Sequence, residues 1–295
     1  MITEQFKKTT VELVRAALEE DIGSGDITSL GCLEPNLLKA EIVAKSEGVL
    51  SGLRPTALAF QLVDSANTFV PRLKDGERFK KGDLIAEISG LNQTILTAER
   101  VALNFMAHLS GVATLTARFV EKIKGHDCRI LDTRKTTPGW RLLEKMAVVH
   151  GGGENHRLGL YDMVLIKDNH IASAGSITEA VDRMRAYMDS PDFRLQFKTG
   201  AKKILIEVEI TDEKELVEAI EAGVDRILLD NRTPEQLKQL VEKARSLNPQ
   251  IKLEASGNVS LDNVTAIAAG GVDYISIGAL THSAPVADFS MRVVQ

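Results

Sequence analysis

The 295-residue sequence predicts an α/β protein with two regions, of which the second is a closed or nearly closed α/β barrel. After residue 128, short apolar segments alternate with helical patterns of about ten or more residues, which is typical of parallel βα units. Nearly every apolar segment of this region ends in polar residues. The first third of the sequence, by contrast, mixes strands and helices without a repeating unit. A doubly wound parallel sheet fits the same alternation and is the alternative to the barrel.

The composition is that of an ordinary globular protein and excludes several classes of function. Hydrophobic residues make up 44% of the chain and charged residues 26%, and the net charge of −5 argues against nucleic acid as the main partner. No apolar run approaches the roughly 20 residues of a membrane span, and the N-terminus lacks the apolar core of a signal peptide. Cys32 and Cys128 lie far apart without CxxC spacing, so no disulfide framework is expected. We therefore predict a cytoplasmic protein that binds neither nucleic acid nor a membrane.

The elements of the first region are predicted one by one. Val11, Val14 and Leu18 recur at helical spacing and predict a helix over 10–20, which ends at the glycine-rich turn 21–26. Residues 94–124 carry a long helical pattern and predict two helices broken near Ser110 and Gly111. Strand-like segments lie near 40–44, 67–72 and 83–88.

The second region repeats strand and helix. Thr233 followed by Pro234 has the form of an N-cap with proline at the first helical position. The predicted strands occupy 129–132, 163–167, 203–209, 226–230, 252–255 and 274–277. The predicted helices occupy 177–188, 213–222, 234–246 and 261–269. Because barrel enzymes place catalytic groups at the C-terminal ends of strands, the polar residues at these ends are the candidates for a site.

Carboxylates mark the ends of two neighbouring strands. Alternation along the strand 203–209 turns Leu205, Glu207 and Glu209 toward the barrel interior. Two carboxylates in a core are costly unless they pair with cations or a metal. Glu209 and Asp230, at the ends of successive strands, therefore form a candidate Mg²⁺ site.

Cations gather in the stretch 131–170, as a pocket for a small, multiply anionic substrate requires. They are Arg134, Lys135, Arg141, His156, Arg157 and Lys167. Three of them have a plainer interpretation when taken singly: Arg134 and Arg157 as surface or ion-paired residues, and His156 as a structural histidine. Arg141 and Lys145 are expected on a solvated helix face.

Two further features are open to two readings. Glu207 either lines the site or is a buried ion-pair partner, for instance of Lys135 or Lys167. The glycines at 151–153 are either a flexible turn or a weak phosphate signal. The small residues at 255–258 and 276–279, which include Ser256, Gly257 and Gly278, suggest a phosphate site after the last two strands, or ordinary βα turns.

Several motifs together resemble those of the quinolinate phosphoribosyltransferase family. They are DTRKTTPG at 132–139, NHRLGL at 155–160 and KDNH at 167–170, with EDIGSGDIT at 20–28, TAER at 97–100, EVE at 207–209, LDN at 229–231, EASGN at 254–258 and GALTH at 278–282. The resemblance covers essentially the whole chain. It implies an N-terminal α/β sandwich over 1–111, joined by the C-terminal tail 281–295, and an incomplete, open α/β barrel over 112–280.

The resemblance also implies a reaction and a set of roles. Quinolinate and 5-phosphoribosyl-1-pyrophosphate would give nicotinate mononucleotide, pyrophosphate and CO₂ with Mg²⁺, in a homodimer or higher homo-oligomer with shared active sites. The quinolinate carboxylates would be held by Arg134, His156, Arg157 and the neighbouring subunit's Arg100, with Lys167. The second substrate would be held by Lys135, Lys167, Glu209, Asp230, Ser256, Gly257 and Gly278, with Glu209 and Asp230 also binding the metal.

Two alternatives are weighed against this reading. A non-decarboxylating nicotinate phosphoribosyltransferase would need fewer cations, because its substrate has one carboxylate fewer. A carrier module is suggested by the lipoyl-like segment 75–83, but Lys80 and Lys81 precede a strand and do not occupy a tight turn.

Overall fold

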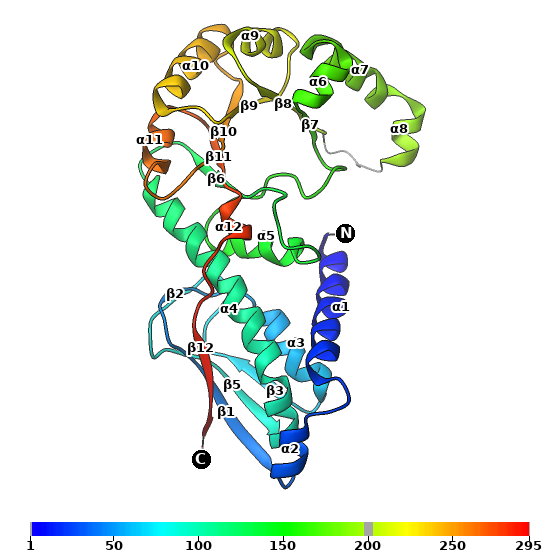
Figure 1. Cartoon of the computed structure of the whole chain (residues 1–295), viewed down its shortest axis with the longest axis vertical. Coiled ribbons are helices and arrows are strands. Elements are labelled where there is room, and N and C mark those ends of the chain that lie inside the picture. Colours follow the sequence, from blue (N-terminus) through cyan, green and yellow to red (C-terminus); the bar gives the residue numbers. More distant parts are fainter. Residues whose placement is uncertain (1, 198–202, 295) are drawn as a thin grey trace. The chain divides into compact units, whose positions relative to one another are not determined.

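The computed structural model describes residues 2–197 and 203–294, which form two compact units (Figure 1). Unit 1 comprises Met1–Ala117, Lys135–Gly153 and Ala279–Gln295, and unit 2 comprises Arg118–Arg134 and Glu154–Gly278. Among the described residues, no helix is both long and apolar enough to cross a membrane.

Unit 1 is built on a four-stranded antiparallel sheet in the order β12–β1–β5–β3. These strands are β12 (Phe289–Val294), β1 (Leu37–Ala44), β5 (Leu84–Leu91) and β3 (Thr68–Pro71), and a smaller sheet pairs β2 (Gly48–Val49) with β4 (Arg78–Phe79). The helices of the unit are α1 (Ile2–Ile22), α2 (Ile27–Cys32), α3 (Leu53–Val63), α5 (Arg141–His150) and α12 (Ala279–His282), with the first part of α4 (Asn92–Lys122). Alternation along β1 and β5 buries Ala40, Ile42 and Ile88 on one face of the sheet, which gives the unit its α/β sandwich.

The C-terminal strand β12 completes this sheet. It pairs antiparallel with β1 from Lys39↔Val294 to Ala44↔Phe289, and the ion pair between Arg292 and Glu41 crosses the same register at 2.7 Å. The edge of β1 is thereby covered by a segment from the far end of the sequence.

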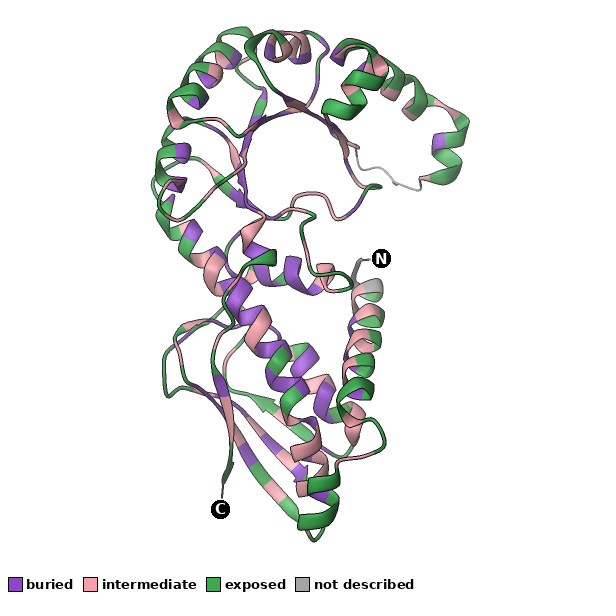
Figure 2. Ribbon diagram, viewed as in Figure 1, coloured by how far each residue is buried: buried purple, intermediate pink, exposed green. Residues whose placement is uncertain are grey.

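Unit 2 is an open α/β barrel. Its six strands are parallel and lie in the order β6–β11–β10–β9–β8–β7, with β6 and β7 at the two ends of the sheet. They are β6 (Arg129–Leu131), β7 (Val164–Ile166), β8 (Ile206–Ile210), β9 (Arg226–Asp230), β10 (Lys252–Ser256) and β11 (Tyr274–Ser276). The helices are α6 (Asp168–Ala174), α7 (Ile177–Asp189), α8 (Pro191–Gln196), α9 (Glu213–Glu221), α10 (Pro234–Leu247) and α11 (Val264–Ala269), most of them outside the ring of strands (Figure 1). The strands are largely buried (Figure 2), so the predicted barrel is confirmed in its open form.

The caps of the helices in unit 2 follow from the sequence. Thr233 is the N-cap of α10, where it forms a capping box with Gln236, and Pro234 occupies the first helical position as predicted. Asp212 caps α9 and Ser176 caps α7 in the same way, through side-chain oxygens that accept amide hydrogen bonds.

The predicted break near Gly111 is wrong, because α4 is one continuous helix. A Cβ atom at Gly111 would collide with the carbonyl oxygen of Pro285, whose chain crosses the helix there. The glycine therefore allows the close approach of another segment and does not end the helix.

The segment 135–153 also differs from the ranges predicted for the two domains, because it clusters with unit 1. Its contacts explain the assignment. The Trp140 ring stacks on Phe105 of α4 with centroids 4.6 Å apart, and Glu144 accepts a hydrogen bond from the ring nitrogen Nε2 of His108 at 2.8 Å.

Candidate active site

The C-terminal ends of the parallel strands bring most of the predicted residues together in unit 2. Arg134 follows β6, Lys167 follows β7, Glu209 lies on β8, Asp230 ends β9 and Ser256 ends β10. Gly257 and Gly278 follow β10 and β11, and His156 and Arg157 belong to the segment after 154 that bridges to the end of β6. Because the C-terminal ends of parallel strands meet at one edge of a sheet, this edge is the candidate site.

Lys167 and Glu209 form an ion pair between the ends of β7 and β8. The Lys167 side chain is 44% exposed and that of Glu209 is 15% exposed, so both groups are accessible at the edge of the barrel. The backbone N–H of Lys167 donates to Nδ1 of His170, in the first turn of α6, at 3.0 Å. This contact fixes the main chain of Lys167. An anionic ligand with a bound cation can replace this ion pair, with the anion bound by Lys167 and the cation by Glu209.

The turns after β9 and β10 are locked to each other. Asn231 and Asn258 both have left-handed backbones, at φ 53° and 50°, and Gly257, which precedes Asn258, has φ 93°. The Asn231 amide donates to the Ser256 carbonyl at 2.8 Å, and Asn258 Nδ2 donates to Asn231 Oδ1 at 3.0 Å. A Cβ atom on Gly257 would overlap Asn231, so only glycine fits. Asp230 is held in the same turn by Asn231 Nδ2 at 2.6 Å.

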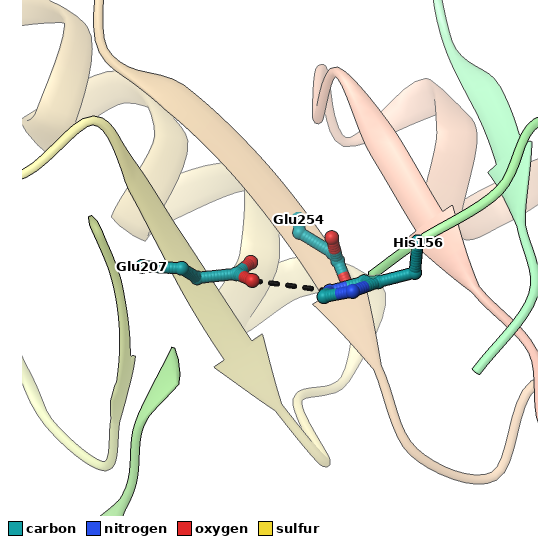
Figure 3. Close-up of side chains that lie close together, drawn as sticks. All are labelled: His156, Glu207 and Glu254. Atoms are coloured by element: carbon teal, nitrogen blue, oxygen red, sulfur yellow. Dashed lines mark ion pairs between the residues drawn. The ribbon is translucent and has the colours of Figure 1, made fainter. Parts of the chain in front are cut away.

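A buried cluster lies deeper in the barrel, where Glu207 of β8 and Glu254 of β10 meet His156 of the segment between α5 and β7 (Figure 3). His156 Nε2 is 3.0 Å from Glu207 Oε2 of β8 and 3.4 Å from Glu254 Oε1 of β10. Glu254 Oε2 also accepts a hydrogen bond from Arg226 Nη1 of β9 at 2.9 Å. Both glutamates are fully buried, so their charges depend on these partners.

The cluster shifts the pKa values of its members strongly. Burial and the nearby charge of Glu254 raise the pKa of Glu207 to about 7, against the opposing effect of His156. Burial also acts to raise the pKa of Glu254, but contacts with His156 and Ser276 and the charge of Arg226 lower it overall. For His156, burial is outweighed by the two carboxylates, which raise its pKa to about 9.

One contact opposes protonation of His156. The backbone N–H of Arg157 donates to His156 Nδ1 at 2.7 Å, and a doubly protonated ring has no acceptor there. The neutral His156 ring therefore carries its hydrogen on Nε2, the nitrogen that faces the two carboxylates.

The buried cluster and the predicted metal ligands differ in their donor atoms and in their need for a metal ion. His156, Glu207 and Glu254 place a nitrogen and two carboxylate oxygens within 4.8 Å of one another, the spacing of a metal site. Arg226 balances the charge of Glu254, and burial with the charge of Glu254 raises the pKa of Glu207 to about 7, so that Glu207 can hold a proton and the cluster needs no ion. Glu209 and Asp230 offer only oxygen atoms at the partly exposed strand ends, which is the donor set that Mg²⁺ prefers when it keeps its waters.

Arg134 and Arg157 create a positive field beside the cluster. Burial and then the charge of Arg134 lower the pKa of Arg157, so the two guanidinium groups lie close enough to repel each other. Arg157 Nη1 donates to the Met163 carbonyl at 3.2 Å, which fixes one side of its fork. Two adjacent guanidinium groups are well suited to a dicarboxylate.

Arg100 and Lys135 are the predicted site residues that belong to unit 1. Arg100 is exposed on α4. The Lys135 carbonyl accepts a hydrogen bond from Thr281 Oγ1 at 2.8 Å, and the nearby Thr137 amide donates to Glu144 Oε2 at 3.0 Å. These contacts fix the main chain at the lysine carbonyl and two residues after it.

Several predicted side-chain environments are corrected by the structure. Lys145 is buried and does not lie on a solvated face, and the ion-pair partner of Glu207 is His156, whereas Lys167 pairs with Glu209. The glycines at 151–153 have a structural explanation, since Gly151 packs against the Ala113 carbonyl and caps α5.

Glu254 and Asp132 were given no role from the sequence. Asp132 is fully buried and accepts hydrogen bonds from the His156 amide at 2.9 Å and from Asn155 Nδ2 at 2.6 Å. The signal for Glu254 was present, because it follows a buried leucine on its strand just as Glu207 follows Ile206.

Comparisons with known proteins agree with this architecture. The family model described as quinolinate phosphoribosyl transferase, C-terminal domain, matches residues 112–292, and the corresponding N-terminal domain matches residues 26–110. The chain is 44% identical over 274 residues to a probable nicotinate-nucleotide pyrophosphorylase [carboxylating] of Bacillus subtilis, covering 93% of this chain and 90% of the relative. It is 36% identical over 289 residues to quinolinate phosphoribosyltransferase [decarboxylating] 1b of Nicotiana tabacum, covering 95% and 81%.

A solved structure has the same fold. The nicotinate-nucleotide pyrophosphorylase of Francisella tularensis superposes with a TM-score of 0.89 at 38% identity, over 97% of this chain and 96% of that one. The chain therefore belongs to the quinolinate phosphoribosyltransferase family.

Proposed function

We propose that this enzyme transfers the phosphoribosyl group of 5-phosphoribosyl-1-pyrophosphate to quinolinate and releases CO₂, with Mg²⁺ as the cofactor. The observation that carries the proposal is that the cations Arg134 and Lys167 and the carboxylates of Glu209 and Asp230 all stand at the C-terminal ends of the barrel strands, with Arg157 near enough to Arg134 to feel its charge. The names of the similar proteins, carboxylating or decarboxylating, favour quinolinate over the nicotinate alternative.

Quinolinate is held by forked cations. Arg134 and Arg157 take its two adjacent carboxylates, because a guanidinium matches a carboxylate with two parallel hydrogen bonds. His156 and Lys167 extend this set. Arg100 of the neighbouring subunit completes it in a homodimer, which is supported by its exposed position on α4.

The phosphoribosyl donor occupies the ends of the remaining strands. Lys135 and Lys167 contact the pyrophosphate, and Glu209 and Asp230 hold the ribose hydroxyls and Mg²⁺. The Mg²⁺ would neutralise charge on the departing pyrophosphate. The 5′-phosphate lies against Ser256, Gly257 and Gly278, where the absence of large side chains lets backbone amides approach an anion.

The chemistry then follows from charge. The pyridine nitrogen attacks the anomeric carbon as the C–O bond to pyrophosphate breaks, and positive charge develops on the ribose. The carboxylates of Glu209 and Asp230 stabilise this positive charge, while Lys135 and Lys167 stabilise the negative charge on the departing pyrophosphate. The quaternary nitrogen so formed stabilises the carbanion left when the adjacent carboxylate departs as CO₂, and a proton from water completes nicotinate mononucleotide.

An assay tests the function directly. Purified protein is given 5-phosphoribosyl-1-pyrophosphate and Mg²⁺ with quinolinate or nicotinate in parallel. We expect nicotinate mononucleotide and CO₂ from quinolinate alone. Turnover of nicotinate instead would favour the alternative, a non-decarboxylating nicotinate phosphoribosyltransferase. Turnover of neither substrate would refute the proposal.

The metal ligands are tested separately. Asp230→Ala should raise the Mg²⁺ concentration needed for half-maximal turnover, because one of two carboxylates is lost. Asp262→Ala, an exposed carboxylate before α11, is the control. An unaltered Mg²⁺ dependence in Asp230→Ala would remove this residue from the metal site.

A further inference from the structure

A chain of polar contacts runs through the barrel unit and ends at the main chain of Arg157. It starts at Tyr274, over whose ring the Arg226 guanidinium lies at 4.2 Å. Arg226 donates to Glu254 at 2.9 Å, and the other Glu254 oxygen lies 3.4 Å from His156 Nε2. The opposite ring nitrogen of His156 accepts the Arg157 amide at 2.7 Å.

The imidazole of His156 therefore works as a rigid spacer. Its side chain is only 7% exposed, and both of its ring nitrogens contact protein groups. Its own amide is fixed independently by Asp132 at 2.9 Å. With its backbone held, the ring orientation is decided by the carboxylates at Nε2, and this orientation in turn decides where the Arg157 amide finds its acceptor.

The two carboxylates at Nε2 are not equivalent. Glu254 is anchored by the hydrogen bond from Arg226, and the ion pair lies across neighbouring strands. Neither oxygen of Glu207 has a hydrogen-bond partner of good geometry among the described residues, and the same holds for Glu254 Oε1, the oxygen that faces His156. Glu207 Oε2 lies nearer to His156 Nε2, at 3.0 Å against 3.4 Å for Glu254 Oε1, but only Glu254 is held by another side chain, through the hydrogen bond from Arg226 to its Oε2. An anchored group can fix the ring, whereas an unanchored one follows it.

We propose that Glu254, held by Arg226, is a positioning residue that fixes the His156 imidazole and, through it, aims the Arg157 guanidinium at a quinolinate carboxylate. The inference rests on the proposed function for the identity of the carboxylate. The contact between Arg157 Nη1 and the Met163 carbonyl sets the other end of the same side chain. The Arg157 side chain is thus held at both ends by protein groups, His156 at its main chain and the Met163 carbonyl at its guanidinium.

Amide hydrogen exchange, resolved by NMR, tests the positioning without any substrate. In Glu254→Gln, the Arg157 amide should lose protection because its acceptor ring is released. The His156 amide should keep its protection, since Asp132 still binds it. Glu207→Gln, which alters an equally buried carboxylate at the same nitrogen, should leave the Arg157 amide protected. Unchanged protection of Arg157 in Glu254→Gln would overturn the proposal.

Kinetics test the consequence for substrate. Glu254→Gln should raise KM for quinolinate on the order of tenfold and leave KM for 5-phosphoribosyl-1-pyrophosphate unchanged, because only the aim of one binding group is altered. In a His156→Ala background the same substitution should have little further effect, because the spacer is already gone. Equal rises in both KM values, or additive effects of the two substitutions, would contradict the mechanism.

Two controls separate positioning from damage to the fold. Asp273→Asn removes ion pairs to Arg245 and Lys252 at the opposite end of the same sheet, so it should lower stability without changing KM for quinolinate. If Glu254→Gln fails to fold because Arg226 is left without its partner, the pair Arg226→Met with Glu254→Gln removes both charges. The exchange result stands even if the protein turns over no quinolinate, so failure of the proposed function is distinguishable.

Discussion

Like charges lie close together at the edge of the barrel, and this is a property of individual residues. Burial and then the positive charge of Arg134 lower the pKa of Arg157. Such an arrangement is stabilised by an anion that binds both groups. This supports the proposal that the site binds a ligand with two negative groups.

Arg134→Ala should raise KM for quinolinate roughly ten- to a hundredfold, since a charge-assisted, forked contact contributes about 1.5–3 kcal/mol. KM for the second substrate should stay the same, as measured by steady-state kinetics with each substrate varied in turn. The control is Arg183→Ala, whose side chain pairs with Glu179 on the surface of α7. An unchanged KM for quinolinate in Arg134→Ala would remove Arg134 from the carboxylate site.

Gly257 gives a second prediction at this scale, because a matched glycine separates its two constraints. Gly257 and Gly125 have nearly the same backbone, at φ 93° and 94°, but only Gly257 faces a neighbour that a Cβ atom would hit. Alanine at Gly125 should show the backbone strain alone, about 1 kcal/mol in thermal unfolding. Alanine at Gly257 should be more destabilising and should raise KM for 5-phosphoribosyl-1-pyrophosphate. Equal effects of the two variants would show that the close approach to Asn231 is unimportant.

The sequence predicted which residues gather at the strand ends but not which of them pair. Strand alternation placed Glu207 inside the barrel, and it is fully buried there. Its partner His156 lies about fifty positions away in a loop, and no local pattern reports on such a contact. The buried position of Lys145 was missed for a similar reason, since its helix packs against another segment that periodicity alone does not identify.

At the scale of elements, the six strands of the barrel and four of its helices were predicted within a few residues, because the apolar segments are short and bounded by turn residues. The short helices α6 and α8 were not predicted. Glycine was the least reliable signal. Gly111 was interpreted as a helix break, whereas its function is to admit the backbone of Pro285. A glycine within a helical pattern has both meanings, and only the tertiary contact distinguishes them.

Gly111→Ala should therefore destabilise the protein, although alanine has the higher helix propensity. The added methyl group would force Pro285 and its neighbours away from α4. Gly31→Ala in α2 is the matched control, because nothing lies near its Cβ position, and it should be neutral or stabilising. Thermal unfolding of both variants decides the matter. A stable Gly111→Ala would mean that the crossing segment adjusts freely.

The largest scale is that of the assembly, where the proposal of a shared site makes a strong prediction. Mixing Arg100→Ala chains with Lys167→Ala chains should restore part of the activity, because hybrid dimers contain one intact site. The mixture is assayed after verified subunit exchange, with each parent inactive alone. Absence of rescue under these conditions would contradict the supply of Arg100 by a neighbour. The control is a double variant in which every chain carries both Arg100→Ala and Lys167→Ala, and it should show no rescue.

The pairing of β12 with β1 also has a consequence during synthesis. Roughly 250 residues separate the two strands, so at the usual pace of translation the ribosome needs on the order of 10 to 50 s between them. For that interval the hydrogen-bonding edge of β1 is uncovered on the nascent chain, and another strand could pair with it. The glutamate at position 41, which later meets Arg292, places a charge on that edge. A charge at an uncovered edge disfavours the addition of a foreign strand. The same side chain therefore protects the edge of β1 before β12 is made, and it helps to set the register of the pairing with β12 afterwards.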